Sequence, residues 1–426
     1  MNSVSTTIVI INVVLALLFS LGAAPILVWI ERRVAGLIQD RLGPNRCHIN
    51  GFRLGGLIQS FADMLKLVFK EDFQSKSIKQ GFFFSLAPVI VFVSAFLTFM
   101  VMPFADTLVI GEDHFRMQGL PIDLGILWFL AFAGLSVYGI MLGGWASHNK
   151  YSLLGSMRAA AQMVSYEAAM GLSLVSVLIT YGSIDLVEIV NFQGETFFGI
   201  PAWGILLQPL AGLIFIVTAF AEANRTPFDI AEGESEIVGG FHTEYSAMRF
   251  GLFFVGEYVA MSASSALIVT LFLGGYHLPY LNTHTLHSHM PLFLIAIMAL
   301  FPLLSLFFAR WIKRNNRFTH AFDIRNKESA ALIKLLVVLN VIVVFGIGMF
   351  LYMGLDQTSI HIATAMVQIA TFAFKLLFMN FVFVWVRWTL PRFRYDQLQD
   401  LGWRILMPLA IANIFITATV VVVFGV

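Results

Sequence analysis

Long apolar runs recur along this chain, and short polar segments separate them. A helix needs about 20 apolar residues to cross the hydrocarbon core of a bilayer. About ten runs are long enough, and they occupy residues 7–30, 81–105, 123–146, 160–182, 201–221, 246–273, 291–309, 332–354, 363–386 and 405–425. This pattern predicts an all-α fold: a polytopic transmembrane helix bundle that makes residues 1–426 a single integral membrane domain.

The first run lacks the features of a cleaved signal peptide. No lysine or arginine precedes residues 7–30, and no small-residue cleavage site follows them. The run is also longer than the apolar core of a signal peptide. We therefore expect it to remain in the protein as a membrane span.

The lysines and arginines predict how the bundle is oriented. Basic residues are retained on the cytoplasmic side of a membrane. If the ten spans alternate from an outer N-terminus, 24 of the 26 lysines and arginines fall in inner segments. Only Arg116 then lies outside, and only Lys375 lies in the middle of a span. This topology puts both termini outside.

Composition supports a membrane protein and excludes several other classes. The chain is 58% hydrophobic and 12% charged, whereas soluble proteins average about 25% charged residues. Its formal net charge of +1 argues against a nucleic-acid partner, which would require a basic surface. A single cysteine, Cys47, excludes a disulfide framework and any cysteine-ligated zinc or iron–sulfur site built by this chain alone.

No nucleotide-binding motif is present either. The sequence contains neither G-x-G-x-x-G nor G-x-x-x-x-G-K-[ST], the glycine-rich loops that hold dinucleotides and triphosphates. We therefore expect this chain to bind no redox cofactor, so that any such cofactor belongs to a partner.

Residues 55–71, between the first two spans, have the pattern of an amphipathic helix. Its apolar positions are Leu57, Phe61, Met64, Leu65 and Val68. Its opposite face carries Asp63, Lys66 and Lys70. Such a helix either lies in the membrane interface or packs on a partner, and the pattern does not separate the two.

Residues 222–245 form an acidic segment on the predicted inner, cytoplasmic face. It contains six carboxylates: Glu222, Asp229, Glu232, Glu234, Glu236 and Glu244. Clustered carboxylates repel one another, so some should have raised pKa values, as a proton relay or a charge sensor requires. The plainer alternative is a solvated acidic loop. The interleaved Pro227, Phe228 and Ile230 favour a loop folded against protein.

Three charged residues fall inside predicted spans. They are Glu167, Glu257 and Lys375. A charge at the centre of a span costs about 2.5–3.5 kcal/mol on insertion scales, and is a functional hypothesis by default. The two acids and one base could form a proton path. Alternatively, Glu257 and Lys375 neutralise each other as a packing device.

A histidine-rich loop follows the sixth span. It contains His277, His284, His287 and His289. Their spacing would allow a metal ion to bind, but no cysteine or carboxylate accompanies them. We therefore interpret this segment as an ordinary polar loop and predict no metal site.

Four stretches of the chain together resemble one known family. They are Glu31-Arg-Arg with residues 39–46 (QDRLGPNR), residues 59–66 (QSFADMLK), residues 222–236 (EANRTPFDIAEGESE), and residues 389–397 (TLPRFRYDQ) with Gly402-Trp403. The chain is similar to the H subunit of bacterial proton-pumping NADH:quinone oxidoreductase, respiratory complex I, whose mitochondrial counterpart is subunit 1. The resemblance covers residues 1 to about 275 and 360–426.

The resemblance stops between these two parts. Members of this family usually contain eight spans, whereas residues 285–360 add the two predicted at 291–309 and 332–354. An even number of added spans leaves the downstream orientation unchanged. We expect this insertion to pack against a neighbouring subunit or lipid.

The resemblance implies a role in quinone access. In this family the protein shapes a lipid-accessible tunnel for the substrate quinone, while the ligands of the quinone headgroup belong largely to a neighbouring hydrophilic subunit. The matching motif positions make Arg32, Phe61, Asp63, Arg225 and Phe228 the expected wall residues.

The resemblance also implies a proton-coupling path. The family's acidic funnel would map onto Glu167, Glu222, Asp229, Glu232, Glu234, Glu236 and Glu257, with Lys375 as a candidate member from its mid-span position. The expected partners are hydrophilic-arm subunits, which would carry FMN and iron–sulfur clusters, together with small membrane subunits, antiporter-like subunits and lipid. The expected location is the bacterial inner membrane.

Two other functions remain open from the sequence. Hydrogenase-type membrane complexes contain an anchor subunit with much of the same pattern. A stand-alone secondary transporter would also suit the intramembrane charges. However, transporters often show internal repeats with broken spans in corresponding positions, and this chain shows none.

Overall fold

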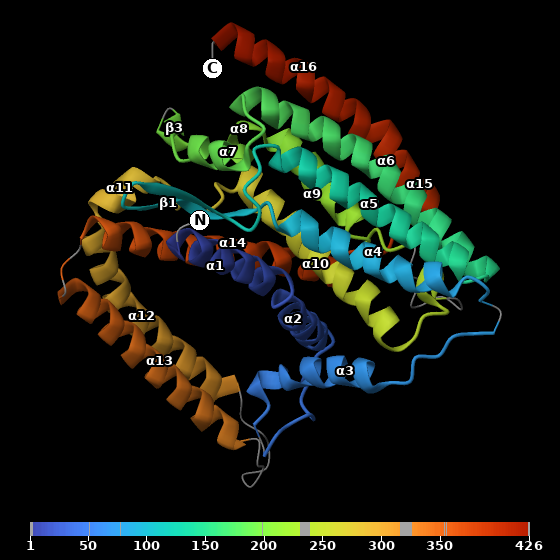
Figure 1. Cartoon of the computed structure of the whole chain (residues 1–426), viewed down its shortest axis with the longest axis horizontal. Helices are drawn as coiled ribbons and strands as arrows, with labels where there is room; N and C mark the ends of the chain where they lie inside the picture. Colours follow the sequence, from blue (N-terminus) through green and yellow to red (C-terminus); the bar gives the residue numbers. More distant parts are fainter. Residues whose placement is uncertain are drawn as a thin grey trace.

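Long helices dominate the computed structural model, which describes residues 3–50, 52–76, 78–197, 199–230, 239–315, 326–352, 354 and 356–424 (Figure 1). Within these residues, nine helices are long and apolar enough to cross a membrane. The prediction of an all-α polytopic bundle is therefore confirmed.

The long helices follow the predicted spans closely. They are α1 (Ser3–Ser20) continuing into α2 (Ala23–Ile38), α4 (Gly81–Phe99), α5 (Gly125–Ala146), α6 (Lys150–Tyr181), α10 (Ala247–Phe272), α12 (Met290–Asn315), α13 (Asn326–Tyr352), α14 (Gln357–Thr389), and α15 (Tyr395–Asp400), which runs through a π-helical turn (Leu401–Leu406) into α16 (Met407–Phe424).

Shorter elements connect them. The short helices are α3 (Ile58–Phe69), α7 (Leu186–Gln193), α8 (Gly204–Leu207), α9 (Pro209–Glu222) and α11 (Thr283–Ser288). The strands are β1 (Pro103–Ile110), β2 (Asp113–Gln118), β3 (Thr196–Phe197) and β4 (Ile200–Pro201).

The fifth predicted span, 201–221, is the one that differs most from the structure. The chain leaves the helical conformation at Gln208, between α8 and α9, where φ is −131° and ψ is 60°. Pro209 follows, and it has no backbone N–H to continue the preceding helix. The 14 residues of α9 extend only about 21 Å, which is short for a full span.

A β-hairpin replaces the end of the second predicted span. The helix stops at Phe99 rather than at residue 105, and β1 pairs with β2 in an antiparallel register. The turn contains Gly111 at φ +66°. Val101, Met102 and Phe104 are buried in the core, which explains their apolar character. In the sequence they extend the apolar run of the preceding helix, so the span was predicted to be too long.

The core of the bundle surrounds α10. This helix packs on α4, α14 and α2, and it is the most buried of the long helices. Small residues allow the neighbouring α4 and α5 to approach closely. A Cβ on Gly139 would lie 2.6 Å from the Val91 side chain and 3.1 Å from the Ala87 carbonyl oxygen. Close backbone approach of this kind drives helix association in membranes.

The amphipathic pattern at 55–71 forms α3, which lies beside the C-terminal half of α2 (Figure 1). Its apolar side chains are not covered by this chain, since Phe61, Leu65 and Val68 are all more than half exposed. Both predictions for this helix, the membrane interface and a partner surface, agree with that exposure.

Candidate functional site

A buried cluster of charged side chains lies where α2, α10, α14 and the loop after α9 meet. Arg387 Nη1 lies 2.6 Å from Glu31 Oε1. Arg225 Nη1 lies 3.7 Å from Glu31 Oε2, and its Nη2 lies 3.8 Å from Glu257 Oε2. Arg225 therefore stands between two carboxylates at nearly equal distances. We call Glu31, Arg225, Glu257, Tyr258 and Arg387 the arginine cluster.

Tyr258 ties the arginine cluster together. Its hydroxyl donates a hydrogen bond to Glu31 Oε2 at 2.6 Å. The Arg225 guanidinium lies 4.2 Å from the centre of the Tyr258 ring, a cation–π contact. Buried charges are costly unless they are paired, and Glu31 and Arg225 are 9% and 5% exposed. The pairing therefore compensates charges that few water molecules reach.

The backbone positions Arg225 at the end of α9. Its N–H donates to the Phe220 carbonyl oxygen, and its own carbonyl accepts from the N–H of Phe228. Gln162 on α6 donates to the Ala221 carbonyl oxygen at 2.7 Å and to Asn224 Oδ1 at 3.2 Å. The loop therefore leaves the helix in a fixed direction.

Asp229 forms a second ion pair beside the arginine cluster. Its Oδ2 accepts a hydrogen bond from Arg392 Nη2 at 3.0 Å. Burial raises the pKa of Asp229 to about 6, and the nearby Arg392 opposes that rise. Burial, rather than repulsion among the clustered carboxylates, is the main cause of this raised pKa.

A small, partly open cavity adjoins these groups. Its walls combine charged and aromatic side chains: Asn224, Arg225, Asp229, His242, Phe250, Phe253, Phe254, Glu257 and Arg387. Such a mixture of apolar walls and a few convergent polar groups is typical of ligand sites.

A second small cavity lies between α4, α5 and α10. Glu222 borders it with three hydroxyl residues, Thr98, Ser136 and Ser264. Glu222 Oε2 is buried and accepts no hydrogen bond from the described residues. Glu167 on α6 is close enough to interact with Glu222 electrostatically. Two predicted path residues therefore lie near each other here.

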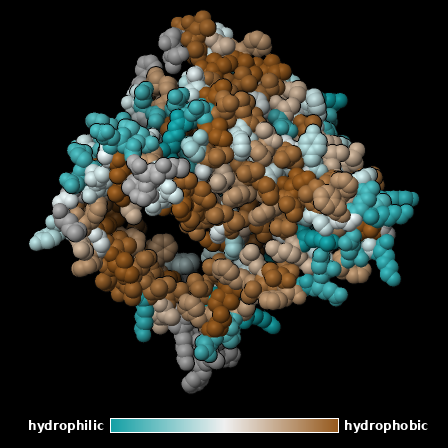
Figure 2. Space-filling model, in the orientation of Figure 1, coloured by the Kyte–Doolittle hydropathy of each residue, from teal (hydrophilic) through white to brown (hydrophobic). Residues whose placement is uncertain are grey.

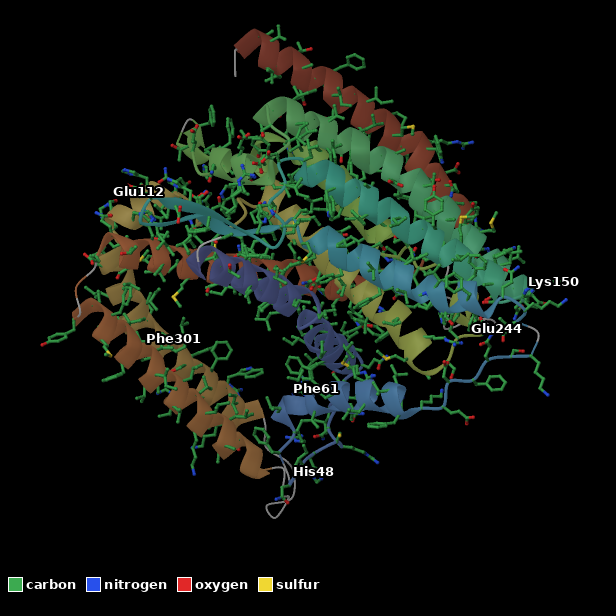
Figure 3. The ribbon with its side chains drawn as sticks, viewed as in Figure 1. His48, Phe61, Glu112, Lys150, Glu244 and Phe301 are labelled. Atoms are coloured by element: carbon green, nitrogen blue, oxygen red, sulfur yellow. The ribbon has the colours of Figure 1, made fainter. Side chains whose placement is uncertain are left out.

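Arg32, Asp63 and Phe61 meet at the junction of α2 and α3. Arg32 and Asp63 form an ion pair. Phe61 is 51% exposed on the same helix as Asp63 (Figure 3). Trp29 Nε1 donates to the Gly55 carbonyl oxygen at 3.0 Å, which fixes the start of α3 against α2.

Phe228 lies behind the cavity rather than on its wall. Its ring packs between Tyr166, at 5.5 Å, and Phe393, at 5.4 Å, and it is 4% exposed. Of the five residues expected to line a tunnel, the structure thus places Arg225 on the cavity, three at the α2–α3 junction, and Phe228 in the packing beneath the loop.

Lys375 does not join the acidic residues, and the pairing of Lys375 with Glu257 was wrong. Its ammonium donates to the carbonyl oxygens of Leu273, Gly275 and His277, at 2.6–3.0 Å. Leu273 follows Glu257 by 16 residues, or about 24 Å along a helix. A lysine can donate three hydrogen bonds, and the unpaired carbonyls at the end of a helix are natural acceptors.

Two further predictions concern the loops. Glu232, Glu234 and Glu236 lie outside the described residues. In the histidine-rich segment, the ring of His287 lies 4.4 Å from that of His361 on α14. Within the described part of the chain, no three histidine, cysteine or acidic side chains are arranged to hold a metal ion.

Several members of the site were missed by reasoning from the sequence. Arg387 and Arg392 were interpreted as topology signals, and Tyr258 and His242 carried no signal of their own. Glu31 was noticed, because an acid does not belong among the basic residues that end a span. That anomaly was the available signal, since an isolated acid at this position requires a nearby cation.

Known proteins resemble this chain over nearly its whole length. The family model described as NADH dehydrogenase matches residues 10–328 and 327–418. The chain is similar to the H subunit of NADH-quinone oxidoreductase from Salinibacter ruber, with 40% identity over 95% of this chain and 93% of the relative. It is also similar to NADH-quinone oxidoreductase subunit 8 of Rhodothermus marinus, with 39% identity over 94% of each chain.

A third relative bears on the extra helices. One of the H subunits of NADH-quinone oxidoreductase from Geobacter sulfurreducens, numbered 2, is 39% identical over 422 residues, which cover 99% of both chains. An alignment of this length leaves little room for gaps, so this relative has residues aligned with α12 and α13. The two segments of the family match meet at residues 327–328, at the start of α13.

Proposed function

From the premise that this chain belongs to the NADH dehydrogenase family, as an H-type subunit of NADH-quinone oxidoreductase, we propose that it borders the quinone path and couples quinone reduction to proton movement. The observation that carries this proposal is Arg225, a buried cation that two carboxylates share beside a cavity.

The coarse function follows from the family. The chain is a multi-pass membrane subunit of respiratory complex I, and other subunits of that complex are its partners. The oxidoreductase activity belongs to the complex, and this chain is not catalytic alone. Quinone is the substrate of the complex. An anchor role in a hydrogenase-type complex and a stand-alone transporter are not favoured.

The quinone path would run from the α2–α3 junction to the cavity beside the arginine cluster. The exposed Phe61 offers an apolar surface to an isoprenoid chain, while the Arg32–Asp63 ion pair marks the polar border. Phe250, Phe253 and Phe254 continue the apolar wall in the cavity. The cavity wall also carries Arg225, which would meet a headgroup that becomes negative.

Coupling would begin at the arginine cluster. Arg225 contacts Glu31 and Glu257 at 3.7 and 3.8 Å, longer than a strong charge-assisted hydrogen bond of about 2.7–2.9 Å. Negative charge that develops on a quinone in the cavity attracts Arg225 away from these carboxylates. A carboxylate that loses its cation binds a proton more readily. The cluster would thus convert electron transfer into proton uptake.

The proton taken up at the arginine cluster would next pass to the carboxylates beside the second cavity. Glu222 is the last residue of α9, directly before the loop that carries Arg225, and it interacts electrostatically with Glu167 on α6. Two neighbouring carboxylates resist simultaneous ionisation, so that a proton is shared between them. We infer that this pair carries the proton path onward, toward the antiporter-like subunits.

The remaining partners are part of the same proposal. The hydrophilic arm, with its FMN and iron–sulfur clusters, would lie over the inner face that carries the arginine cluster and the loop after α9. Small membrane subunits and lipid would cover the sides. The bilayer would be the bacterial inner membrane, with both termini of this chain outside.

The first test is Arg225→Gln in the intact, membrane-embedded complex. This substitution removes the cation that would meet the charge developing on the quinone. Because loss of one charge-stabilising donor typically lowers a rate by about 100-fold or more, NADH:quinone reductase activity should fall by at least about tenfold. NADH oxidation by a soluble artificial acceptor, which needs only the hydrophilic arm, should not change. The activities of both reactions are measured on the same preparation.

The matched control is Arg404→Gln. Arg404 is 78% exposed and pairs with Asp400 one helical turn away, and such surface pairs contribute about 0–1 kcal/mol. Wild-type quinone reductase activity in Arg225→Gln would refute the proposal, as would an equal loss in both variants.

A further inference from the structure

The hairpin of α12 and α13 stands apart from the rest of the molecule. It contacts the body at its outer end, where Leu286, Met290, Leu294 and Ala363 form a small apolar cluster with neighbouring side chains. From there it diverges from α1 and α2 (Figure 1). Figure 2 shows a deep hollow between the hairpin and the body. We call this hollow the wedge.

The hairpin presents large apolar side chains almost everywhere along its length. Within the described residues, almost none of its apolar stretch is buried. Its exposed apolar side chains include Leu303, Leu304, Leu306, Phe307, Phe308, Leu335, Val338 and Ile342. Helix–helix interfaces in membranes favour small residues that let backbones approach. Bulky side chains exposed all around a helix suit acyl chains better than another helix.

A basic group ends this apolar surface. Arg310, Lys313 and Arg314 recur at spacings of three and four residues, so their side chains lie on neighbouring sides of one helical turn, and all three are exposed. No carboxylate among the described residues lies within ion-pair distance of them. Trp311, 53% exposed, accompanies them, as is typical of the membrane–water boundary.

The length of α12 puts this basic group at headgroup depth. Arg310 follows Met290 by 20 residues, or about 30 Å along the helix. That distance equals the thickness of the hydrocarbon core. A lipid with its phosphate at Arg310 would therefore extend its acyl chains along the exposed half of the hairpin, inside the wedge.

We propose that the wedge holds an anionic phospholipid, with its headgroup on Arg310, Lys313 and Arg314 and its acyl chains between the hairpin and α1–α2. Charge complementarity selects an anionic lipid over a zwitterionic one. Each lysine or arginine near the membrane surface contributes roughly a fivefold preference for anionic lipid.

The test uses the intact complex in phosphatidylcholine vesicles that contain a trace of diazirine-labelled phosphatidylglycerol. After illumination, mass spectrometry locates the lipid adducts on this chain. Adducts are expected on the inner half of α12 and on α1 or α2. Unlabelled phosphatidylglycerol should suppress them at far lower concentration than added phosphatidylcholine does.

Arg310→Gln/Lys313→Gln should weaken this preference for phosphatidylglycerol by about thirtyfold. The matched control, Lys150→Gln/Arg158→Gln, also removes one lysine and one arginine, from exposed positions of α6 far from the hairpin (Figure 3). It should leave the competition curves unchanged. Equal competition by both lipids in the wild-type complex would overturn the proposal, even if the double variant failed to assemble. Absence of adducts in the wedge, as expected if a neighbouring subunit fills it, would also overturn it.

Discussion

Arg225 is a single positive charge shared between two buried carboxylates, and this sharing makes it sensitive to any new charge nearby. Glu31 has Arg387 and Tyr258 as additional partners, and Glu257 lies 3.8 Å from Arg225 on its other side. A displacement of Arg225 would therefore change the environment of both carboxylates.

Asp229 gives a prediction that depends on pH. Its pKa is raised to about 6 from an ordinary value of about 3.9, so the folded loop binds a proton that the unfolded chain has released. The stability from this group is present below about pH 4 and is lost as pH rises through 6. Hydrogen exchange of residues 223–230, corrected for intrinsic rates, should therefore show less protection at pH 7 than at pH 5.

Asp229→Asn stays neutral throughout this range and should remove that difference in protection. Arg392→Gln is the informative companion, because it removes the cation that lowers the pKa of Asp229. In that variant the loss of protection should occur at higher pH. The same pH dependence in wild type and Asp229→Asn would show that another group controls the loop.

How far the sequence predicts the residues of the site depends on their local surroundings. Glu257 was identified because a charge within an apolar span is anomalous wherever it packs. Asp229 was identified as one of the clustered carboxylates of the acidic segment, and Arg225 was implied by the family resemblance. Arg387 and Tyr258 could not be identified, since an arginine at the end of a span and a tyrosine within one are both ordinary. Only the meeting of α10, α14 and α2, which are distant in sequence, gives them partners.

Lys375 connects two helices, so its role is structural and not part of the proposed proton path. It joins the middle of α14 to the carbonyl oxygens just beyond α10, with the Trp203 ring 4.6 Å away. Lys375→Met should reduce the amount of assembled complex, because three buried carbonyls lose a charged donor at about 1–3 kcal/mol each.

The complex that does assemble with Lys375→Met should pump the normal number of protons per electron in proteoliposomes. Lys375→Arg, which keeps the charge and several donors, should assemble better than Lys375→Met. A normal yield of Lys375→Met with a reduced proton-to-electron ratio would instead return Lys375 to the proton path.

The close contact between α4 and α5 depends on Gly139, because glycine has no side chain. A Cβ on Gly139 would lie 2.6 Å from Val91, whereas a Cβ on Gly171 in α6 would meet nothing within 4 Å. Overpacking costs about 1–3 kcal/mol, so Gly139→Ala should lower the thermal stability of the complex. Gly171→Ala should match wild type. Equal stability of the two variants would contradict the packing described.

Most helices were predictable because hydrophobic length decides whether a segment spans a bilayer. The β-hairpin and the break at Gln208 were not, since apolar residues occur equally in a buried strand and in a helix. Pro209 does signal a break in the helix. It lies within a continuous run of apolar residues, however, and that run predicted an uninterrupted span. The ends of α6 and α14 were also missed, because both helices extend beyond the apolar run through polar turns.

At the scale of the whole molecule, charge is distributed differently between the surface and the interior. The predicted inner segments carry 24 of the 26 lysines and arginines, which topology alone accounts for. Beneath that surface, a few arginines neutralise buried carboxylates. The path that we propose would begin where three of these arginines, Arg225, Arg387 and Arg392, pair with buried carboxylates.

The central claim is that Arg225 and Glu257 act as one unit in quinone reduction. The most direct measurement is a double-mutant cycle of NADH:quinone reductase activity in the intact complex, with Arg225→Gln, Glu257→Gln and the combined variant. Coupled residues show interaction energies of about 0.5–3 kcal/mol, so the combined loss should be smaller than the product of the two single losses. Single losses that multiply, or no loss at all, would contradict the account.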